Sequence, residues 1–293
     1  MPNYESITAT FDELIVSKYP ESDGKYKSFI LVNGEDGKKY QIKLNEHKQR
    51  HNINEFIAHY VGNCSDMPLL NGMFLEIDKK EIKNLIAKLD TFPKGYLKSF
   101  DLGAMKKNLF FGIEWMQHIT SIDDERELLQ RVGESSNKNS FYGLYSFDQF
   151  MKNYDRHLGN HLIVKIGNSK QYKLIDFDRV FASTNWSRVP SEYTCFTPFI
   201  CTPSAQRYHS FLMYIVLDSS VKLVHSYAGK IQGIDTKDIK DMCDIISFVY
   251  DVPSIEILNI FRWIEYRRQE IVMECLVNEK HFPNITKGLY SVS

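Results

Sequence analysis

The sequence has few cysteines and no long apolar run. Its five cysteines are scattered, and no two have the C-x-x-C spacing of a metal site. An odd, dispersed set is typical of reduced thiols in a cytosolic protein and argues against a disulfide framework. Residues 1–13 contain acids and no apolar core, unlike a signal peptide, and the longest apolar runs, such as residues 211–217, are too short to cross a bilayer. We therefore expect a cytoplasmic protein with no membrane segment.

The sequence also lacks an excess of charge of either sign. Lys and Arg number 36 against 37 Asp and Glu, so the net charge is −1. This balance argues against a large nucleic-acid or anionic-membrane surface, although a local basic groove is compatible with it. The 293 residues are 43% hydrophobic, which is enough to form a core in one large domain or two small lobes.

Strand patterns dominate the first part of the chain and helical patterns the rest. Alternating apolar residues predict a strand at 7–16, and the turn-forming G-E-D-G sequence predicts a hairpin of strands at 28–33 and 39–44. Further strands are expected at 72–77 and in the short apolar run 109–113. A short helix capped by Asn52 or Asn54 is expected to run toward Gly62. Helical spacing predicts further helices at 82–89, 125–132, 141–153, 211–228, 236–250 and 254–278, with a loop at 182–204. We predict an α+β, bilobal fold, with a small β-rich N-lobe at residues 1–115 and a larger helical C-lobe at residues 116–293.

Residues 153–178 contain the most informative pattern. Two apolar strands, 161–166 and 171–176, are separated by the turn-forming sequence G-N-S-K. If residue 166 lies opposite 171, residue 161 faces 176, and Asn160 and Asp176 meet at one end of the hairpin, because cross-strand neighbours are about 5 Å apart. Asp155 precedes Asn160 by five residues, on the loop that enters the first strand.

These residue types suit phosphoryl transfer. A carboxylate can orient the attacking hydroxyl, while a second carboxylate and an amide oxygen hold magnesium between the phosphates of ATP. We predict that Asp155 is the catalytic base and that Asn160 and Asp176 are the Mg²⁺ ligands. The alternative is an Asx-rich turn whose acids are merely solvated, since a lone D-x-x-x-x-N is common by chance.

An upstream lysine and glutamate have the order that the same chemistry requires. Lys43 lies in the strand sequence Y-Q-I-K-L, and Glu55 follows twelve residues later near the start of the predicted helix. Lys43 would neutralise phosphate charge, and Glu55 would fix its rotamer. Taken alone, each residue type is more often a surface charge; the order and spacing of the two favour the functional interpretation.

Two further segments are candidates for binding the rest of ATP. The turn at residues 19–25 contains Ser22 and Gly24 and lies where a glycine-rich phosphate loop is expected, but a single glycine allows only a limited anion nest, and a plain hairpin turn remains an alternative. Backbone groups of Glu114 and Met116 follow an apolar strand and could bond the adenine edge. A buried strand leading into a linker explains the same residues.

Histidines 157 and 161 have the i, i+4 spacing of a zinc-binding helix. The glutamate that follows the first histidine in such helices is missing, and Gly159 lies between them, so zinc is not expected. We expect His157 to brace the loop by hydrogen bonding and Arg156 to form a structural ion pair.

The motif N-x-D-R-H-x-x-N, followed by a short hairpin and I-D-F, resembles the HipA-like kinases, which are bacterial serine/threonine kinases often found in toxin–antitoxin operons. The similarity extends to Y-Q-I-K-L, N-E-F-I-A and I-E-W-M and covers residues 17–182. Phosphatidylinositol kinases share D-R-H-x-x-N and I-D-F but have glycine at the position of Asn153, and aminoglycoside-type phosphotransferases usually have H-G-D. The chain departs from the usual kinase pattern in reading D-F-D instead of D-F-G and in its glycine-poor phosphate turn.

The resemblance implies an ATP-dependent serine/threonine protein kinase, with Asp155 as base, Asn160 and Asp176 as magnesium ligands and Lys43 as the phosphate lysine. It also implies a toxin or phage-defence role, an antitoxin partner, a protein substrate and self-phosphorylation of a phosphate-loop serine, here Ser22, with serines and threonines at 183–202 as competing targets. The alternatives are a phosphatidylinositol-kinase-like or small-molecule kinase and a non-catalytic nucleotide-binding partner protein.

Overall fold

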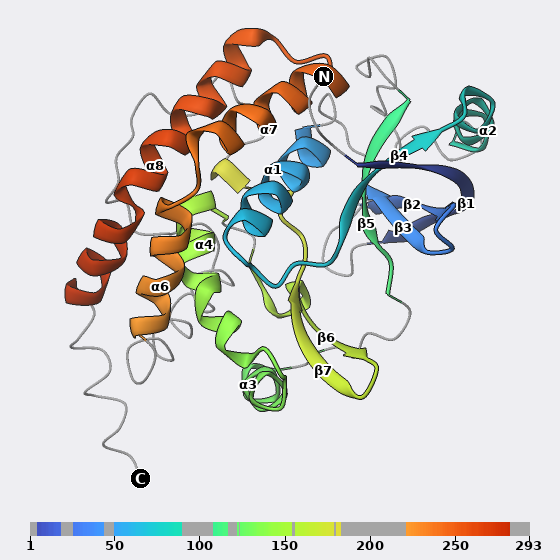
Figure 1. The fold of residues 1–293 in the computed structure, drawn as a ribbon. Coiled ribbons are helices and arrows are strands. Elements are labelled where there is room, and N and C mark those ends of the chain that lie inside the picture. Colours follow the sequence, from blue (N-terminus) through green and yellow to red (C-terminus); the bar gives the residue numbers. More distant parts are fainter. Residues whose placement is uncertain are drawn as a thin grey trace.

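The computed structural model describes residues 5–18, 26–43, 50–89, 108–116, 122, 124–153, 156–178, 180–182 and 221–281. Strands gather on one side of the molecule and most helices on the other, with a hairpin below both (Figure 1). The predicted mixture of strands followed by helices is therefore present.

The five predicted N-terminal strands form a closed barrel. They are β1 (Ser6–Lys18), β2 (Tyr26–Gly34), β3 (Lys39–Lys43), β4 (Gly72–Ile77) and β5 (Leu109–Glu114), in the order β1-β2-β3-β5-β4. Neighbours are antiparallel except β1 and β4, which run parallel from Ser6 opposite Phe74 to Ala9 opposite Ile77. Buried apolar side chains such as Ile30, Ile42 and Phe110 fill the barrel, as in other small barrels.

Helix α1 (Arg50–Cys64) lies between the barrel and the helical side of the molecule (Figure 1). The prediction that Asn52 or Asn54 caps this helix is wrong, because the helix begins at Arg50 and both asparagines are buried within it. Helix α2 (Lys79–Leu89) lies on the outer side of the barrel. Helix α1 is thus the element that connects the two sides.

Helix α4 (Gly143–Met151) is buried along its whole length and packs against α6 (Val221–Gln232), α8 (Ser254–His281) and the 3-10 helix η2 (Lys138–Tyr142). Helix α7 (Thr236–Val249) packs on α8, and α3 (Glu125–Gly133) packs on η2. The short 3-10 helices η3 (Leu158–Asn160) and η4 (Val180–Ala182) precede β6 and follow β7, respectively. The predicted helix at 141–153 is instead η2 followed by α4, which ends where Lys152 adopts a φ of 49°. Of the predicted helix at 211–228, the part before Val221 lies outside the described residues, and α6 continues to Gln232. One apolar core joins α1, α4, α6, α7 and α8.

The hairpin of β6 (His161–Ile166) and β7 (Ser169–Leu174) has a different register from the one predicted. Ile166 lies opposite Ser169, not residue 171, and His161 lies opposite Leu174, not Asp176. The turn contains two residues, and its first, Gly167, has a φ of 59°, which a two-residue turn accepts most readily from glycine. The second strand therefore ends before Asp176.

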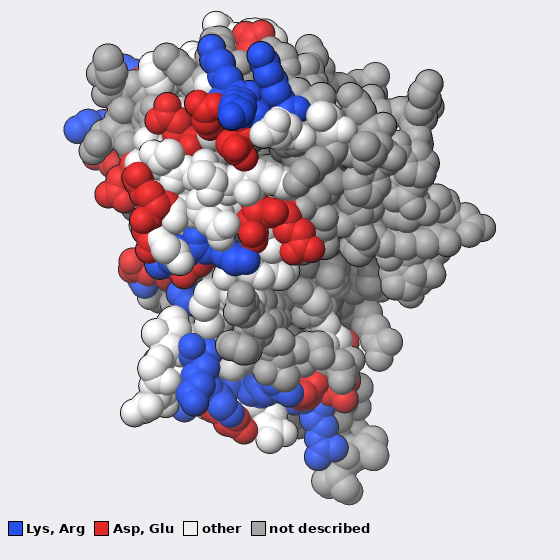
Figure 2. Space-filling model, turned by 90° about the vertical axis from the view of Figure 1, so that its right-hand side faces the viewer, with Lys and Arg blue, Asp and Glu red and all other residues white. Residues whose placement is uncertain are grey.

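Charged side chains of both signs share the described surface. On the face in Figure 2, Lys and Arg side chains lie in separate groups with Asp and Glu nearby. Within the described residues, no helix combines the length and hydropathy that crossing a bilayer requires. The three described cysteines, Cys64, Cys243 and Cys275, are free thiols.

Candidate active site

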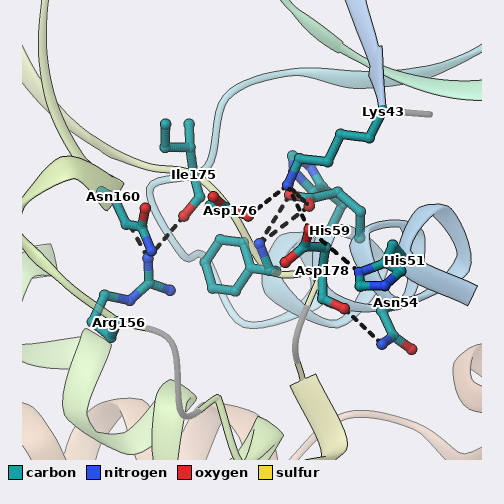
Figure 3. A network of polar contacts seen from close by, with 11 residues as sticks. Lys43, His51, Asn54, His59, Arg156, Asn160, Ile175, Asp176 and Asp178 are labelled. Carbon is teal, nitrogen blue, oxygen red and sulfur yellow. Dashed lines mark hydrogen bonds and ion pairs between the residues drawn. The ribbon is translucent and has the colours of Figure 1, made fainter. Parts of the chain in front are cut away.

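Lys43 on β3 is the centre of a network of carboxylates drawn from two other segments, α1 and the residues after β7 (Figure 3). Its Nζ lies 2.8 Å from Oε2 of Glu55 on α1 and 2.6 Å from Oδ1 of Asp176, which follows β7. The Lys43 side chain is only 18% exposed. The structure therefore brings together three predicted site residues. Glu55 follows Lys43 by 12 positions in the chain, and Asp176 follows it by 133.

A third carboxylate also faces Lys43. Oδ2 of Asp178 lies 3.6 Å from Nζ of Lys43 and 3.4 Å from Nδ1 of His51. The backbone carbonyl of Asp178 accepts a hydrogen bond of 2.8 Å from Nδ2 of Asn54. Residue 178 thus ties the D-F-D segment to the first turns of α1.

The electrostatics keep Lys43 positively charged. Burial alone would lower the pKa of Lys43, but the charges of Asp176, Asp178 and Glu55 outweigh that effect and raise the pKa well above its usual value. The ammonium group is accordingly held as a fixed cation among three carboxylates.

Glu55 binds two groups, the Lys43 ammonium and the backbone of the D-F-D segment (residues 176–178). The backbone N–H of Phe177 donates to the Glu55 carboxylate, at 3.2 Å to Oε1 and 3.1 Å to Oε2. Asp176, just before it, has a φ of 66°, a left-handed conformation that residues other than glycine rarely adopt. Such strain persists only where surrounding contacts fix the backbone, and it is frequent at functional sites.

His59 lies one turn after Glu55 on α1 and is almost fully buried. Its ring packs edge-on against Phe111 and Phe177. A Cβ at position 72 would come within 2.9 Å of the His59 Nδ1, so Gly72 allows this close approach. Burial, assisted by the charge of Lys43, lowers the pKa of His59 to about 3. The imidazole is therefore neutral.

Arg156 organises the loop that leads into β6. Its guanidinium binds both carboxylate oxygens of Asp148 on α4, at 2.8 and 3.0 Å. It also donates to the backbone carbonyls of Ile175, at 2.8 Å, and Asn160, at 3.4 Å, and lies over the ring of Phe177. The predicted structural ion pair of Arg156 is confirmed.

Asn160 adjoins the segment that carries Asp176. The N–H of Ile175 donates to the Asn160 carbonyl at 3.2 Å, so the two residues lie at the same end of the hairpin despite the changed register. His157 accepts a hydrogen bond from the N–H of Gly159, which confirms its predicted bracing of this loop. His161 instead faces Tyr172, with 2.8 Å between Nδ1 and the hydroxyl.

The donor atoms near this hairpin end suit a hard cation. Amide and carboxylate oxygens, such as those of Asn160 and Asp176, are the ligands that Mg²⁺ prefers. Within the described part of the chain, no group of three or more His, Cys, Asp and Glu side chains is arranged to hold a metal ion. The assignment of Asn160 and Asp176 as magnesium ligands remains a prediction.

The two predicted hinge residues lie at and just beyond the end of β5. The Glu114 carboxylate accepts hydrogen bonds from Asn71, at 2.6 Å, and Lys38, at 3.2 Å. Met116 packs against a small apolar cluster formed by Leu70, Leu162 and Val164. Residues of the hairpin thus lie beside the strand that the prediction places next to adenine.

Three predicted site residues, Asp155, Ser22 and Gly24, lie outside the described residues. Sequence reasoning missed the contacts of Asp148, Asp178 and His51. The sequence D-F-D, in place of D-F-G, was the available signal for Asp178, because a carboxylate two residues after Asp176 can reach the same Lys43 ammonium. Nothing local marks Asp148 as the partner of Arg156.

A solved structure shows that the fold is kinase-like. The chain is similar to the proinflammatory kinase CtkA of Helicobacter pylori, with 12% identity and a TM-score of 0.54 over 95% of this chain and 99% of that one. It also matches HipA of Shewanella oneidensis MR-1, solved with HipB and operator DNA, at 10% identity and a TM-score of 0.42, over 96% of this chain and 66% of that one. No curated protein matched the sequence.

The family follows from the sequence itself. The model of the HipA-like kinase family matches residues 15–205, about two thirds of the chain. The chain belongs to the HipA-like kinase family. The matched range contains Lys43, Glu55 and the D-F-D segment, whereas α6, α7 and α8 lie beyond it.

Proposed function

We propose that this protein is an ATP-dependent kinase that phosphorylates serine or threonine on a protein substrate. The observation that carries the proposal is the convergence of Glu55 and Asp176 on the Lys43 ammonium, at 2.8 and 2.6 Å, in a chain of the HipA-like kinase family. Phosphoryl transfer depends mainly on positioning and on stabilising charge, and this arrangement provides both.

Each residue has a distinct part in the proposed reaction. Lys43 neutralises charge on the ATP phosphates, and Glu55 holds Lys43 and the Phe177 backbone together. Asp155 accepts the proton of the substrate hydroxyl, and Asn160 and Asp176 hold magnesium. Magnesium and ATP, when bound, supply the transferable phosphoryl group and part of the charge neutralisation.

The fold suggests how the two parts of the chain share this work. We assign residues 1–115, which include the barrel and α1, to an N-lobe that binds ATP through Lys43, the turn with Ser22 and Gly24, and the backbone at Glu114 and Met116. Residues 116–293 form the C-lobe with the catalytic loop. HipA in the solved complex is bound to the antitoxin HipB, and we propose that this cytoplasmic kinase has an antitoxin partner in a toxin–antitoxin or phage-defence system.

The test is transfer of a heavy-isotope-labelled γ-phosphate from ATP to proteins in a lysate, followed by mass spectrometry. Labelled phosphoserine or phosphothreonine that appears with wild type and not with Asp155→Ala supports the proposal. Label on a phosphoinositide or another small molecule would move the acceptor to the lipid or small-molecule class. ATP binding without any labelled product would indicate a non-catalytic nucleotide-binding protein.

A further inference from the structure

Helix α8 contacts both segments that carry the proposed centre, although it lies outside the region that matches the family model. The contacts come from Trp263 and Arg267, which are one turn apart on the same face of the helix. Both side chains are buried, with 4% and 3% of their surface exposed. Their partners are the end of α4 and the turn that follows the D-F-D segment.

Arg267 binds the carboxyl end of α4. Its Nη2 donates to the Gln149 carbonyl at 2.7 Å, and its Nε donates to the Phe150 carbonyl at 3.4 Å. The last carbonyls of a helix have no partner within the helix, and a cation there also interacts favourably with the helix dipole. Only a few residues separate these carbonyls from Asn153 and from the proposed catalytic loop that follows, the segment between Asn153 and β6 that carries Asp155.

Trp263 reaches the other segment. Its ring meets Phe181 edge-on, with 4.8 Å between ring centroids, and lies 6.1 Å from the ring of Phe150. Phe181 is buried and has a φ of 66°, so the backbone three residues after Asp178 is held in a strained conformation. The Arg267 guanidinium lies over the Trp263 ring at 5.6 Å, which links the two contacts.

We propose that Trp263 and Arg267 form a bracket on α8 that aligns the catalytic loop with the D-F-D segment, and that Arg267 is a positioning residue for phosphoryl transfer. The inference rests on the proposed kinase function. The catalytic loop leaves α4, while Asp176 follows β7. Arg156 links α4 to the Ile175 carbonyl from within the loop, and the α8 bracket is a second element that holds both segments. Lys43 and Glu55 belong to β3 and α1, and Asp176 is paired directly with Lys43 at 2.6 Å, so nucleotide binding is expected to depend on the bracket much less.

The same helix provides a matched control. Arg268 is the next residue, and it holds the end of α6, where Nη1 lies 3.1 Å from the Gln232 carbonyl. It also pairs with Thr236 and Glu265. Its described contacts thus resemble those of Arg267 in kind, but they do not involve α4 or residues 175–182.

The experiment compares wild type with Arg267→Met, Arg267→Lys and Arg268→Met. Three quantities are measured: the single-turnover rate at saturating MgATP, the Kd for MgATP with its binding stoichiometry, and hydrogen exchange of peptides covering 149–160 and 177–182. In Arg267→Met we expect a rate loss of about 10- to 100-fold, because small misplacements of catalytic groups have large effects. The stoichiometry should stay that of wild type, the Kd should change by less than about threefold, and both peptides should exchange faster.

The conservative variant separates positioning from simple packing. Lysine keeps the charge but cannot fork across two carbonyls, so Arg267→Lys should restore the rate only in part. Arg268→Met should match wild type in rate and in exchange of both peptides. If Arg267→Met does not fold, Arg267→Lys and Trp263→Leu carry the same comparison.

Several outcomes would overturn the bracket. One is a rate for the Arg267 variants within about twofold of wild type; another is faster exchange confined to residues 149–160. If the single-turnover rate of Arg267→Met falls only as far as the fraction of protein that binds MgATP, the variant has lost folded protein, and the role of Arg267 is purely structural. Absence of phosphoryl transfer in wild type would contradict the proposed function instead, and the exchange data would still decide whether α8 holds both segments.

Discussion

Replacing His59 with leucine tests whether this buried, neutral histidine on α1 lowers the stability of the fold at acidic pH. His59 is almost fully buried, and its ring nitrogens have no hydrogen-bond partner among the described residues; the Glu55 carboxylate lies 3.8 Å away. Burial and the nearby Lys43 lower its pKa to about 3. Leucine has a similar size and leaves no buried polar atom unpaired, so we expect the variant to fold at neutral pH.

The expected effect follows from the difference between the folded and unfolded pKa. A histidine in the unfolded chain has a pKa of about 6.5. Between that value and about 3 the unfolded state binds a proton that the folded state excludes, so the free energy of unfolding falls as the pH is lowered. From pH 7 to pH 5, this contribution to stability decreases by about 2 kcal/mol.

The assay is urea unfolding of wild type and His59→Leu at pH 7 and pH 5. Other titrating groups are common to both proteins, so the difference between the two losses isolates His59. Wild type should lose about 2 kcal/mol more than the variant. Equal losses of free energy of unfolding in the two proteins would show that folding does not lower the pKa of His59, and would refute the reasoning.

Three further predictions concern the site and its loop. Lys43→Ala should weaken ATP use, Lys43→Arg should rescue it poorly, and Glu55→Gln should show a milder loss; ATP kinetics unchanged in Lys43→Ala would show that the Lys43 ion pairs are only structural. Arg156→Met should lower the free energy of unfolding by about 3–5 kcal/mol because it leaves the Asp148 carboxylate buried without its ion partner, and denaturant unfolding would measure this. Phosphopeptide mapping should find phosphate on Ser22 in active enzyme, where two added negative charges would repel ATP; a Ser22 peptide that is always bare would exclude this self-phosphorylation.

Local patterns in the sequence predicted the elements well. Alternation, turn signals and a short apolar run located all five barrel strands, and the spacing of Lys43 and Glu55 anticipated two residues that the structure places in contact. These features depend on neighbours in the chain. The closure of the barrel by β1 and β4 does not, because parallel pairing of Ser6 with Phe74 leaves no local signal.

The errors also have physical causes. The hairpin register was wrong because G-N-S-K suits either a four-residue or a two-residue turn, and the positive φ of Gly167 selected the shorter one. The capping role of Asn54 was wrong because its side chain binds the Asp178 carbonyl, 124 residues away. Arg267 was missed for the same reason, since its carbonyl partners are 117 and 118 residues earlier in the chain.

The central claim is that Asp155 and Asp176 have separate tasks in one phosphoryl-transfer site. The most direct test is a measurement of Mg²⁺-dependent ATP binding and single-turnover phosphoryl transfer on purified wild type, Asp155→Ala, Asp176→Ala and the exposed control Asp244→Ala on α7. Asp155→Ala should bind MgATP normally and transfer no phosphate, Asp176→Ala should lose Mg²⁺-dependent binding, and Asp244→Ala should match wild type. Wild-type turnover in Asp155→Ala would contradict the account.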